Sequence, residues 1–265
     1  MGTIIGASAG LLILAALFWI LESLWPEDRA QPHWRDDSPT DLIYWFLGSA
    51  SRLAAAIAVV IAIAALTRLL PHTGLAETAR QPRLLQAAEL LVLADLIGYW
   101  SHRCFHTQPR LWPIHAMHHS PERLDWLAAA WVHPLDTIIT RLVTVVPLYL
   151  LGFGGDVLGP VAGFLAFYPI YLHANLSWDY GPLRYMVASP AYHRWHHSSE
   201  AEALDKNFSA LLPAIDLLFG TAYFPRRHSR RYGLYGERMP RGVLAQLRYP
   251  FRGRQRSSRQ HEARP

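Results

Sequence analysis

Histidines are the residues of this chain whose type and spacing predict chemistry. Ten of its fourteen histidines lie in the stretch 102–197, and most recur in three runs: HRCFH at 102–106, HAMHH at 115–119 and HRWHH at 193–197. Residues at positions i, i+3 and i+4 share one helix face, so each run should direct its imidazoles at one spot. The runs and His173 stand beside apolar segments, where the chain would leave a membrane. The pattern predicts one shared metal site on one side of that membrane.

The number of converging histidines indicates the number of ions. One zinc ion takes three or four protein ligands, and neutral imidazole suits zinc, iron and copper alike. Eight or nine histidines exceed what one such ion can use, so the pattern predicts two ions. No carboxylate recurs within the runs, unlike the Glu-x-x-His pattern of soluble di-iron bundles, and the sequence has no His-Glu-x-x-His protease motif. The lone cysteine, Cys104, excludes an internal disulfide and a thiolate metal cluster.

The histidine runs need membrane helices to position them. Residues 2–21 carry no charge and are long enough to cross a bilayer, and they lack the basic start and cleavage site of a signal peptide. Further apolar blocks cover 42–70 and 84–101, the latter with Glu89 and Asp95. Ionisable residues inside a span usually face the protein interior or a functional site. We therefore expect an integral membrane protein.

Two shorter apolar segments, 142–155 and 157–172, are separated by the glycine-rich stretch GFGGD. Glycines at this position favour a turn between two helices, which form either two full spans or a shallow hairpin. If the third helix ends on the cytoplasmic side, the hairpin returns His173 to that side. The expected fold class is all-α: an integral membrane helical bundle with a cytoplasmic, histidine-rich dimetal cap.

Charge is concentrated at the C-terminal end. Twelve arginines follow from Arg226 onward, whereas the whole chain has a single lysine, Lys206. A basic segment beside membrane spans predicts a cytoplasmic, lipid-facing location, and the chain has no nucleic-acid motif. We expect N-terminal transmembrane helices at 1–83, a catalytic domain at 84–225 and a basic, partly disordered cytoplasmic tail at 226–265. A bacterial inner membrane is the expected location.

The three runs, in this order and beside apolar helices, resemble the histidine boxes of the fatty acid hydroxylase/sterol desaturase superfamily. The resemblance covers roughly residues 90–222. It extends to Asp95, Tyr99 and Trp100 before the first box, WVHPLD after the second, HANL before the third, and DKN and DLLFGT after it. Many relatives carry a basic residue where this chain has Trp131, which puts contacts to a polar head group in doubt.

The resemblance implies a dimetal centre, generally di-iron, that uses O2 to oxidise a lipid, with zinc as a substitute metal. The implied ligands are His102, His106, His115, His118, His119, His173, His193, His196 and His197. His133 is either a ligand or a residue that orients one, and the second role is favoured. Asp95, Asn175 and Asp205 are further candidates to orient a ligand, with an ion pair inside the bundle as the alternative for Asp95. The remaining histidines, His33, His72, His228 and His261, are interpreted as surface or structural residues.

Hydroxylation of a lipid C–H bond is the expected reaction, and desaturation is the alternative because both begin with the same hydrogen abstraction. The small amount of chain outside the metal core favours hydroxylation. No side chain beyond the metal ligands is expected to act as an acid, base or nucleophile. The sequence shows no flavin, nicotinamide or haem motif, so electrons would come from a separate ferredoxin- or cytochrome-type donor. A membrane zinc hydrolase would need a carboxylate base among the histidines, and a metal transporter would need ligands spread across the membrane depth.

Overall fold

The computed structural model describes residues 2–69 and 78–252. Every regular element in these two ranges is a helix, and the strand-like contacts within them are limited to two isolated bridges. The expected all-helical fold is confirmed. His72, His261 and the end of the predicted tail lie outside the described residues.

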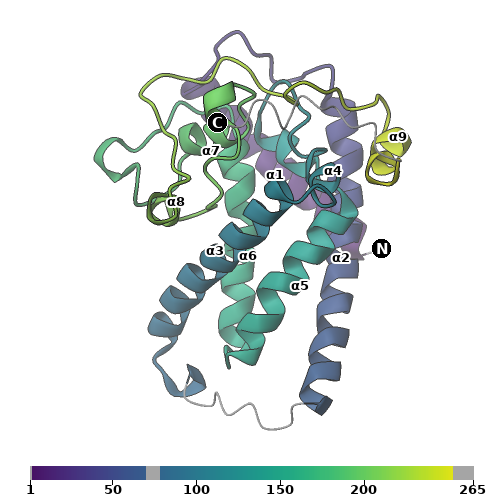
Figure 1. The fold of residues 1–265 in the computed structure, drawn as a ribbon. Coiled ribbons are helices and arrows are strands. Elements are labelled where there is room, and N and C mark those ends of the chain that lie inside the picture. The colour runs from purple at the N-terminus through teal and green to yellow at the C-terminus, as the bar shows by residue number, and fades with distance from the viewer. Residues whose placement is uncertain (1, 70–77, 253–265) are drawn as a thin grey trace.

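Four long helices alternate in direction and form a stalk (Figure 1). They are α2 (Ser38–Leu69), α3 (Arg83–Thr107), α5 (Pro134–Leu150) and α6 (Gly155–His173). The α5–α6 turn contains Gly152 with φ +91°, a conformation that glycine adopts without a steric penalty. The predicted helical hairpin is therefore present. It returns His173 to the end of the stalk at which α3 finishes with the first histidine run.

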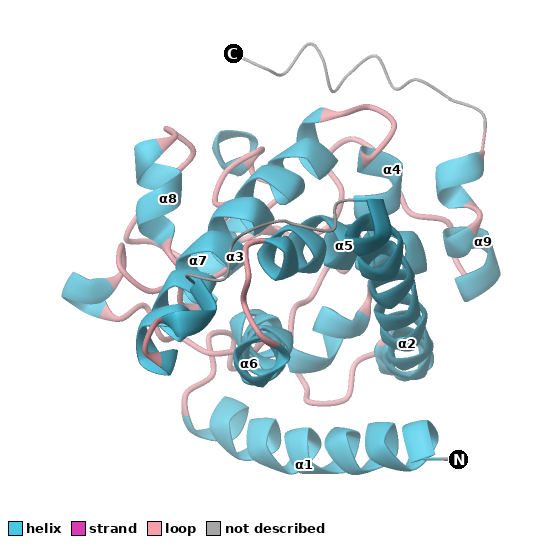
Figure 2. Ribbon diagram, turned by 90° about the horizontal axis from the view of Figure 1, so that it is seen from below, coloured by secondary structure: helices cyan, strands magenta, loops and turns pink. Residues whose placement is uncertain are grey.

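Helix α1 (Gly2–Leu24) does not run along the stalk. Figure 2 shows α1 lengthwise, whereas α2 and α6 are seen nearly end-on, so α1 crosses the bundle obliquely. Within residues 2–69 and 78–252, four helices are long and apolar enough to cross a membrane: α1 from Ile4, α2, α3 and α6. With 17 residues, α5 is about 25 Å long, which is short for a hydrocarbon core of about 30 Å.

Short helices and loops form a cap over one end of the stalk (Figure 1). They include α4 (Trp112–His115), α7 (Pro190–His196), α8 (Pro213–Leu218) and α9 (Val243–Leu247). The first three of these helices have a proline in their first turn, where the missing N–H costs nothing. Ser189 caps α7 by accepting a hydrogen bond from the Tyr192 N–H.

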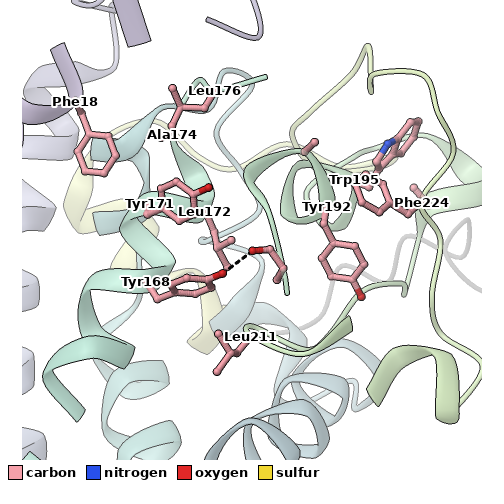
Figure 3. Packing of buried hydrophobic residues seen from close by; sticks show 13 residues of the cluster. Phe18, Tyr168, Tyr171, Leu172, Ala174, Leu176, Tyr192, Trp195, Leu211 and Phe224 are labelled. Atoms are coloured by element: carbon pink, nitrogen blue, oxygen red, sulfur yellow. Dashed lines mark hydrogen bonds between the residues drawn. The ribbon is translucent and has the colours of Figure 1, made fainter. Parts of the chain in front are cut away.

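An aromatic-rich cluster fixes the cap to the stalk (Figure 3). Phe18 of α1 and Tyr168 of α6 share this cluster with Tyr192 and Trp195 of α7. The Tyr168 hydroxyl also donates to the Ala188 carbonyl at 2.6 Å. This packing holds α7, and with it the third histidine run, against the end of α6 that carries His173.

The described part of the basic segment, residues 226–252, also packs on the cap. The Tyr44 hydroxyl donates to Gln246 Oε1 at 2.6 Å, and the Trp112 indole donates to Glu237 Oε1 at 3.0 Å. The arginines of this segment therefore lie at the same end of the stalk as the histidines.

Candidate metal centre

The structure gathers the nine expected ligand histidines into two adjoining groups. In each group, one ring nitrogen of every residue lies within 4.8 Å of those of the other members. The five-histidine group is His102, His106, His115, His119 and His196, and the four-histidine group is His118, His173, His193 and His197. The ring centroids of His119 and His197, one from each group, are 4.4 Å apart.

The second and third runs each divide between the two groups, so the expectation of one spot per run was wrong. His115 and His119 belong to one group, while His118 belongs to the other. Helix α4 ends at His115 and residues 116–119 form a turn, so His118 and His119 do not continue one helix face. His196 is the last residue of α7 and His197 is its C-cap. Neighbouring positions on a helix differ by about 100°, so these two rings diverge.

Outward hydrogen bonds set the protonation of several rings. The Nδ1 atom of His102 lies 2.8 Å from the Phe208 carbonyl oxygen, and that of His196 lies 2.8 Å from the Lys206 carbonyl oxygen. A carbonyl oxygen only accepts, so each ring carries its proton on Nδ1 and leaves Nε2 with a free lone pair. His173 does the same toward the Pro169 carbonyl oxygen, at 2.6 Å.

Two carboxylates support the five-histidine group. Asp136 Oδ2 lies 2.7 Å from His115 Nδ1, and Asp205 Oδ1 lies 3.4 Å from His106 Nδ1. A carboxylate behind an imidazole fixes the ring and raises its basicity as a ligand. Asp205 lies beside His106, and its role in orienting that ligand candidate stays a prediction. Asp136 was not singled out from the sequence, although it ends the WVHPLD segment.

The inward-facing nitrogens fit a metal ion in each group. His102 Nε2 and His115 Nε2 lie 3.0 Å apart with no proton between them, since both rings are protonated on Nδ1. Two ligands bonded to one ion at about 2.1 Å are about 3.0 Å apart at a right angle and about 3.4 Å apart at the tetrahedral angle. In the other group, His118 Nε2 and His173 Nε2 are 3.2 Å apart. Two facing Nε2 lone pairs repel each other, whereas a metal ion placed between them would be bound by both.

Burial keeps the cap imidazoles neutral, which is the state that binds a metal. Seven of the nine rings are buried, and His102 and His118 are half-buried. Desolvation, reinforced by neighbouring imidazoles, lowers the pKa of five cap residues well below the ordinary value: His118, His119, His193, His196 and His197. His196 Nε2 is buried and has no hydrogen-bond partner among the described residues, which also fits a metal ligand.

Asp95 has neither of its two expected roles. It accepts hydrogen bonds from the backbone N–H groups of Ala210, Leu211 and Leu212 at 2.7–3.0 Å. It thereby holds the loop whose Phe208 carbonyl accepts from His102, so its influence on the ligand is indirect.

Asp216 fixes the same loop and was missed as a functional residue. It is fully buried and accepts from the Phe208 and Ser209 N–H groups, both at 2.8 Å. It also accepts from the Tyr192 hydroxyl at 2.8 Å, which links the loop to α7. The available sequence signal was its place at the start of DLLFGT.

His133 and Asn175 lie outside both groups. His133 Nδ1 accepts from the Leu135 N–H at the start of α5, and its Nε2 lies 3.1 Å from the Leu247 carbonyl oxygen. Asn175 bonds to the backbone N–H and carbonyl of Asp28 at 2.9 and 3.0 Å. Both residues join segments of the cap.

The aromatic residues near the site make packing and hydrogen-bond contacts within the cap and with the stalk. Trp195 donates to the Arg227 carbonyl at 3.2 Å, and the Tyr99 hydroxyl lies 2.9 Å from Thr221 Oγ1. Trp131 is buried, stacks on Tyr44 with ring centroids 5.5 Å apart, and places its carbonyl oxygen 3.3 Å from His118 Nδ1.

The histidines interpreted as surface or structural residues, as far as they are described, stay away from the groups. His33 stacks on Trp19 with ring centroids 4.3 Å apart, and His228 pairs with Glu27. His33 and His228 therefore have partners outside both histidine groups.

Residues 87–221 match the family model for fatty acid hydroxylase, a range that holds all nine ligand candidates. The chain belongs to this family. The match lies inside the 84–225 segment that the sequence suggested as catalytic.

Several curated proteins resemble this chain. Ornithine lipid hydroxylase OlsE of Rhizobium tropici is 35% identical over 171 residues, which cover 64% of this chain and 51% of that protein. Alkylglycerol monooxygenase of Danio rerio is 32% identical over 140 residues, or 53% of this chain and 31% of that protein. A putative methylsterol monooxygenase of Dictyostelium discoideum is 26% identical over 143 residues, which is 52% of each. The chain thus spans about half or less of the length of these relatives. No solved structure matches it.

Proposed function

We propose that this protein is a membrane-bound lipid hydroxylase that uses O2 and two iron ions held by the nine histidines. The observation that carries the proposal is the convergence of neutral imidazoles, with unprotonated Nε2 atoms 3.0–3.2 Å apart, in two adjoining groups. The family and the names of the relatives support an oxygenase.

Iron bound in the two groups would supply the reduction of O2 and the attack on an unactivated C–H bond. The protein's residues supply the positioning. Asp136 and the Phe208 carbonyl hold His115 and His102 with their lone pairs inward. Phe208 and Trp112 lie with ring centroids 5.1 and 5.2 Å from that of His106 and exclude water from that side. Zinc binds such nitrogen ligands more tightly than ferrous iron and would compete for the site.

Hydroxylation is preferred to desaturation. Three relatives are named hydroxylase or monooxygenase, which are activities that place oxygen in the product. The stalk also offers few helices to enclose a long acyl chain, since α2, α3, α5 and α6 form it among the described residues.

The catalytic cap is proposed to face the cytoplasm of a bacterial inner membrane. Exposed arginines of the 226–252 segment lie at the cap end, and arginine-rich segments favour the cytoplasmic side. A similar protein comes from the bacterium Rhizobium tropici. The electron donor is proposed to be a separate ferredoxin- or cytochrome-type protein that docks on this basic face.

Labelled oxygen tests the reaction. The full chain, in membranes, is loaded with ferrous iron and given a reductant and ¹⁸O2, and its lipids are analysed by mass spectrometry. We expect a lipid product with one ¹⁸O atom, which His196→Ala should abolish and His33→Ala should not. A new double bond without label would mean a desaturase, and no oxidised lipid from the iron-loaded protein would overturn the proposal.

A further inference from the structure

Two arginines lie on stalk helices that pack against each other. Arg52 is on α2 and Arg141 is on α5, and α2 packs along α5. Each arginine lies in the N-terminal half of its helix, and both helices begin at the cap end of the stalk (Figure 1). Arg52 is exposed and Arg141 is half-buried, so the pair can be reached from outside the bundle.

No acidic side chain among the described residues neutralises this pair. Arg52 donates only to Ser49 Oγ, at 2.8 Å, and Arg141 makes no side-chain hydrogen bond or ion pair. By contrast, Arg83 at the opposite end of the stalk pairs with Asp156 at 3.0 Å. Charged residues inside a membrane protein are costly and usually mark a functional path or a binding site.

The carboxylates nearest along the two helices are already engaged. Asp136 of α5 bonds to His115 and accepts from Thr140, and Asp41 of α2 pairs with Arg35 at 2.7 Å. Among the described residues, no carboxylate of these two helices is therefore left to pair with Arg52 or Arg141.

The pair also lies close to the metal centre along both helices. Arg141 follows Asp136 by five residues, or about 7–8 Å of helix, and Asp136 contacts a ligand candidate. Arg52 follows Tyr44 by eight residues, or about 12 Å, and Tyr44 stacks on Trp131. The polar residues Thr137, Thr140 and Thr144 continue along α5 beside Arg141. A group held by the arginines could leave an attached carbon chain within reach of the histidines.

We propose that Arg52 and Arg141 bind the anionic head group, a phosphate or a carboxylate, of the lipid that the metal centre oxidises. Two guanidinium groups present paired N–H donors that match such an anion. This assignment rests on the proposed lipid hydroxylation. It narrows the substrate to lipids whose head group is negatively charged and lies next to the start of the acyl chain.

Lipid retention tests the site without turnover. The metal-free full chain is equilibrated with equal amounts of dioleoyl phosphatidic acid and dioleoylglycerol, which differ only in the phosphate, and bound lipid is measured by native mass spectrometry. We expect wild type to retain the anionic lipid preferentially and Arg52→Gln/Arg141→Gln to lower that preference about tenfold or more. Arg52→Lys/Arg141→Lys should keep part of it, because the charge remains and the paired donors are lost.

Arg68→Gln is the matched control, since Arg68 is exposed in the last turn of the same α2. It should leave the preference unchanged. Equal retention of both lipids by wild type, an unchanged preference in the double glutamine variant, or an equal loss in Arg68→Gln would each overturn the assignment. The last result would indicate ordinary attraction of interfacial arginines to bulk lipid.

The ¹⁸O2 assay separates this proposal from the function on which it rests. With both lipids supplied, the ratio of kcat/KM for the anionic to the neutral lipid should fall in the double glutamine variant. If the protein binds the anionic lipid preferentially but oxidises no lipid, the proposed function is wrong and the binding site stands. If the protein oxidises the anionic and the neutral lipid equally well, the head-group assignment is wrong and the proposed function stands.

Discussion

The two histidine groups differ in what stands behind their rings. In the five-histidine group, carboxylates lie behind His115 and His106, and carbonyl oxygens lie behind His102 and His196. In the four-histidine group, the outward contacts described are carbonyl oxygens behind His118 and His173. The Nδ1 atom of His193 is buried without a partner among the described residues.

Because of this difference, ions bound in the two groups would not be equivalent. Carboxylates behind the ligands increase their basicity and help to balance the charge of the ion. The five-histidine group should therefore hold its ion more tightly. With fewer ligands and no carboxylate hydrogen-bonded to them in the described structure, the four-histidine group should hold its ion more weakly and leave more of it open to O2 or lipid.

Removing one ligand from either group should have the largest effect. We expect His196→Ala and His118→Ala to abolish lipid oxidation, because each removes a nitrogen from one of two ions that act together. Both variants should still insert into the membrane, which membrane fractionation checks. Full activity in His118→Ala would show that the four-histidine group is dispensable.

Asp136→Asn should weaken metal binding in the five-histidine group alone. The amide is nearly isosteric but neutral, so His115 loses its carboxylate, and the metal affinity of the five-histidine group should fall about 10–100-fold. Competition with a chelator measures this fall, and the four-histidine group should be unaffected. Asp156→Asn, at the far end of the stalk, is the control because Asp156 pairs only with exposed Arg83. An equal loss in both groups would contradict the comparison.

Acid should destabilise the metal-free protein. Burial lowers the pKa of His193 and His197 below the unfolded value of about 6.5, so the unfolded state binds more protons as the pH falls. Stability should therefore be complete above about pH 6.5 and decline below it, and each 1 kcal/mol lost would lower Tm by about 2–4 °C. Thermal unfolding of metal-free protein at pH 8 and pH 5 measures the change. A Tm that is equal or higher at pH 5 would show that these rings are not kept neutral by the fold.

His33→Ala and His228→Ala should have the smallest effects. Both residues lie outside the groups, and His228 is mostly exposed, so the free energy of unfolding should change by about 0.5 kcal/mol or less. Activity should stay near that of wild type in the ¹⁸O2 assay. A loss comparable to that of His196→Ala would show that the separation of ligand candidates from other histidines is wrong.

The sequence predicted those features that depend on local spacing. Four-residue spacing placed His102 with His106 and His193 with His197, because residues one turn apart share a helix face. Apolar length predicted the spans, and glycines predicted the turn after Leu150.

Features that depend on tertiary contacts were not predictable in this way. The carbonyl oxygens behind His102 and His196 come from residues 208 and 206, and any residue type supplies a carbonyl. The role of Asp95 depends on where the 210–212 backbone lies, and no spacing along α3 reveals this. The oblique course of α1 likewise depends on its packing through Phe18 rather than on its composition.

The metal content of each chain shows whether the nine histidines hold two ions. Purified wild type, His102→Ala/His106→Ala and His193→Ala/His197→Ala are loaded with ferrous iron under nitrogen, and bound metal is counted by elemental analysis of monodisperse protein. If each histidine group binds one ion, wild type should hold two metal ions and each double variant one. The His193→Ala/His197→Ala variant should keep the ion of the five-histidine group. A single metal in wild type, or two metals in either double variant, would contradict the assignment of two ions to these two groups.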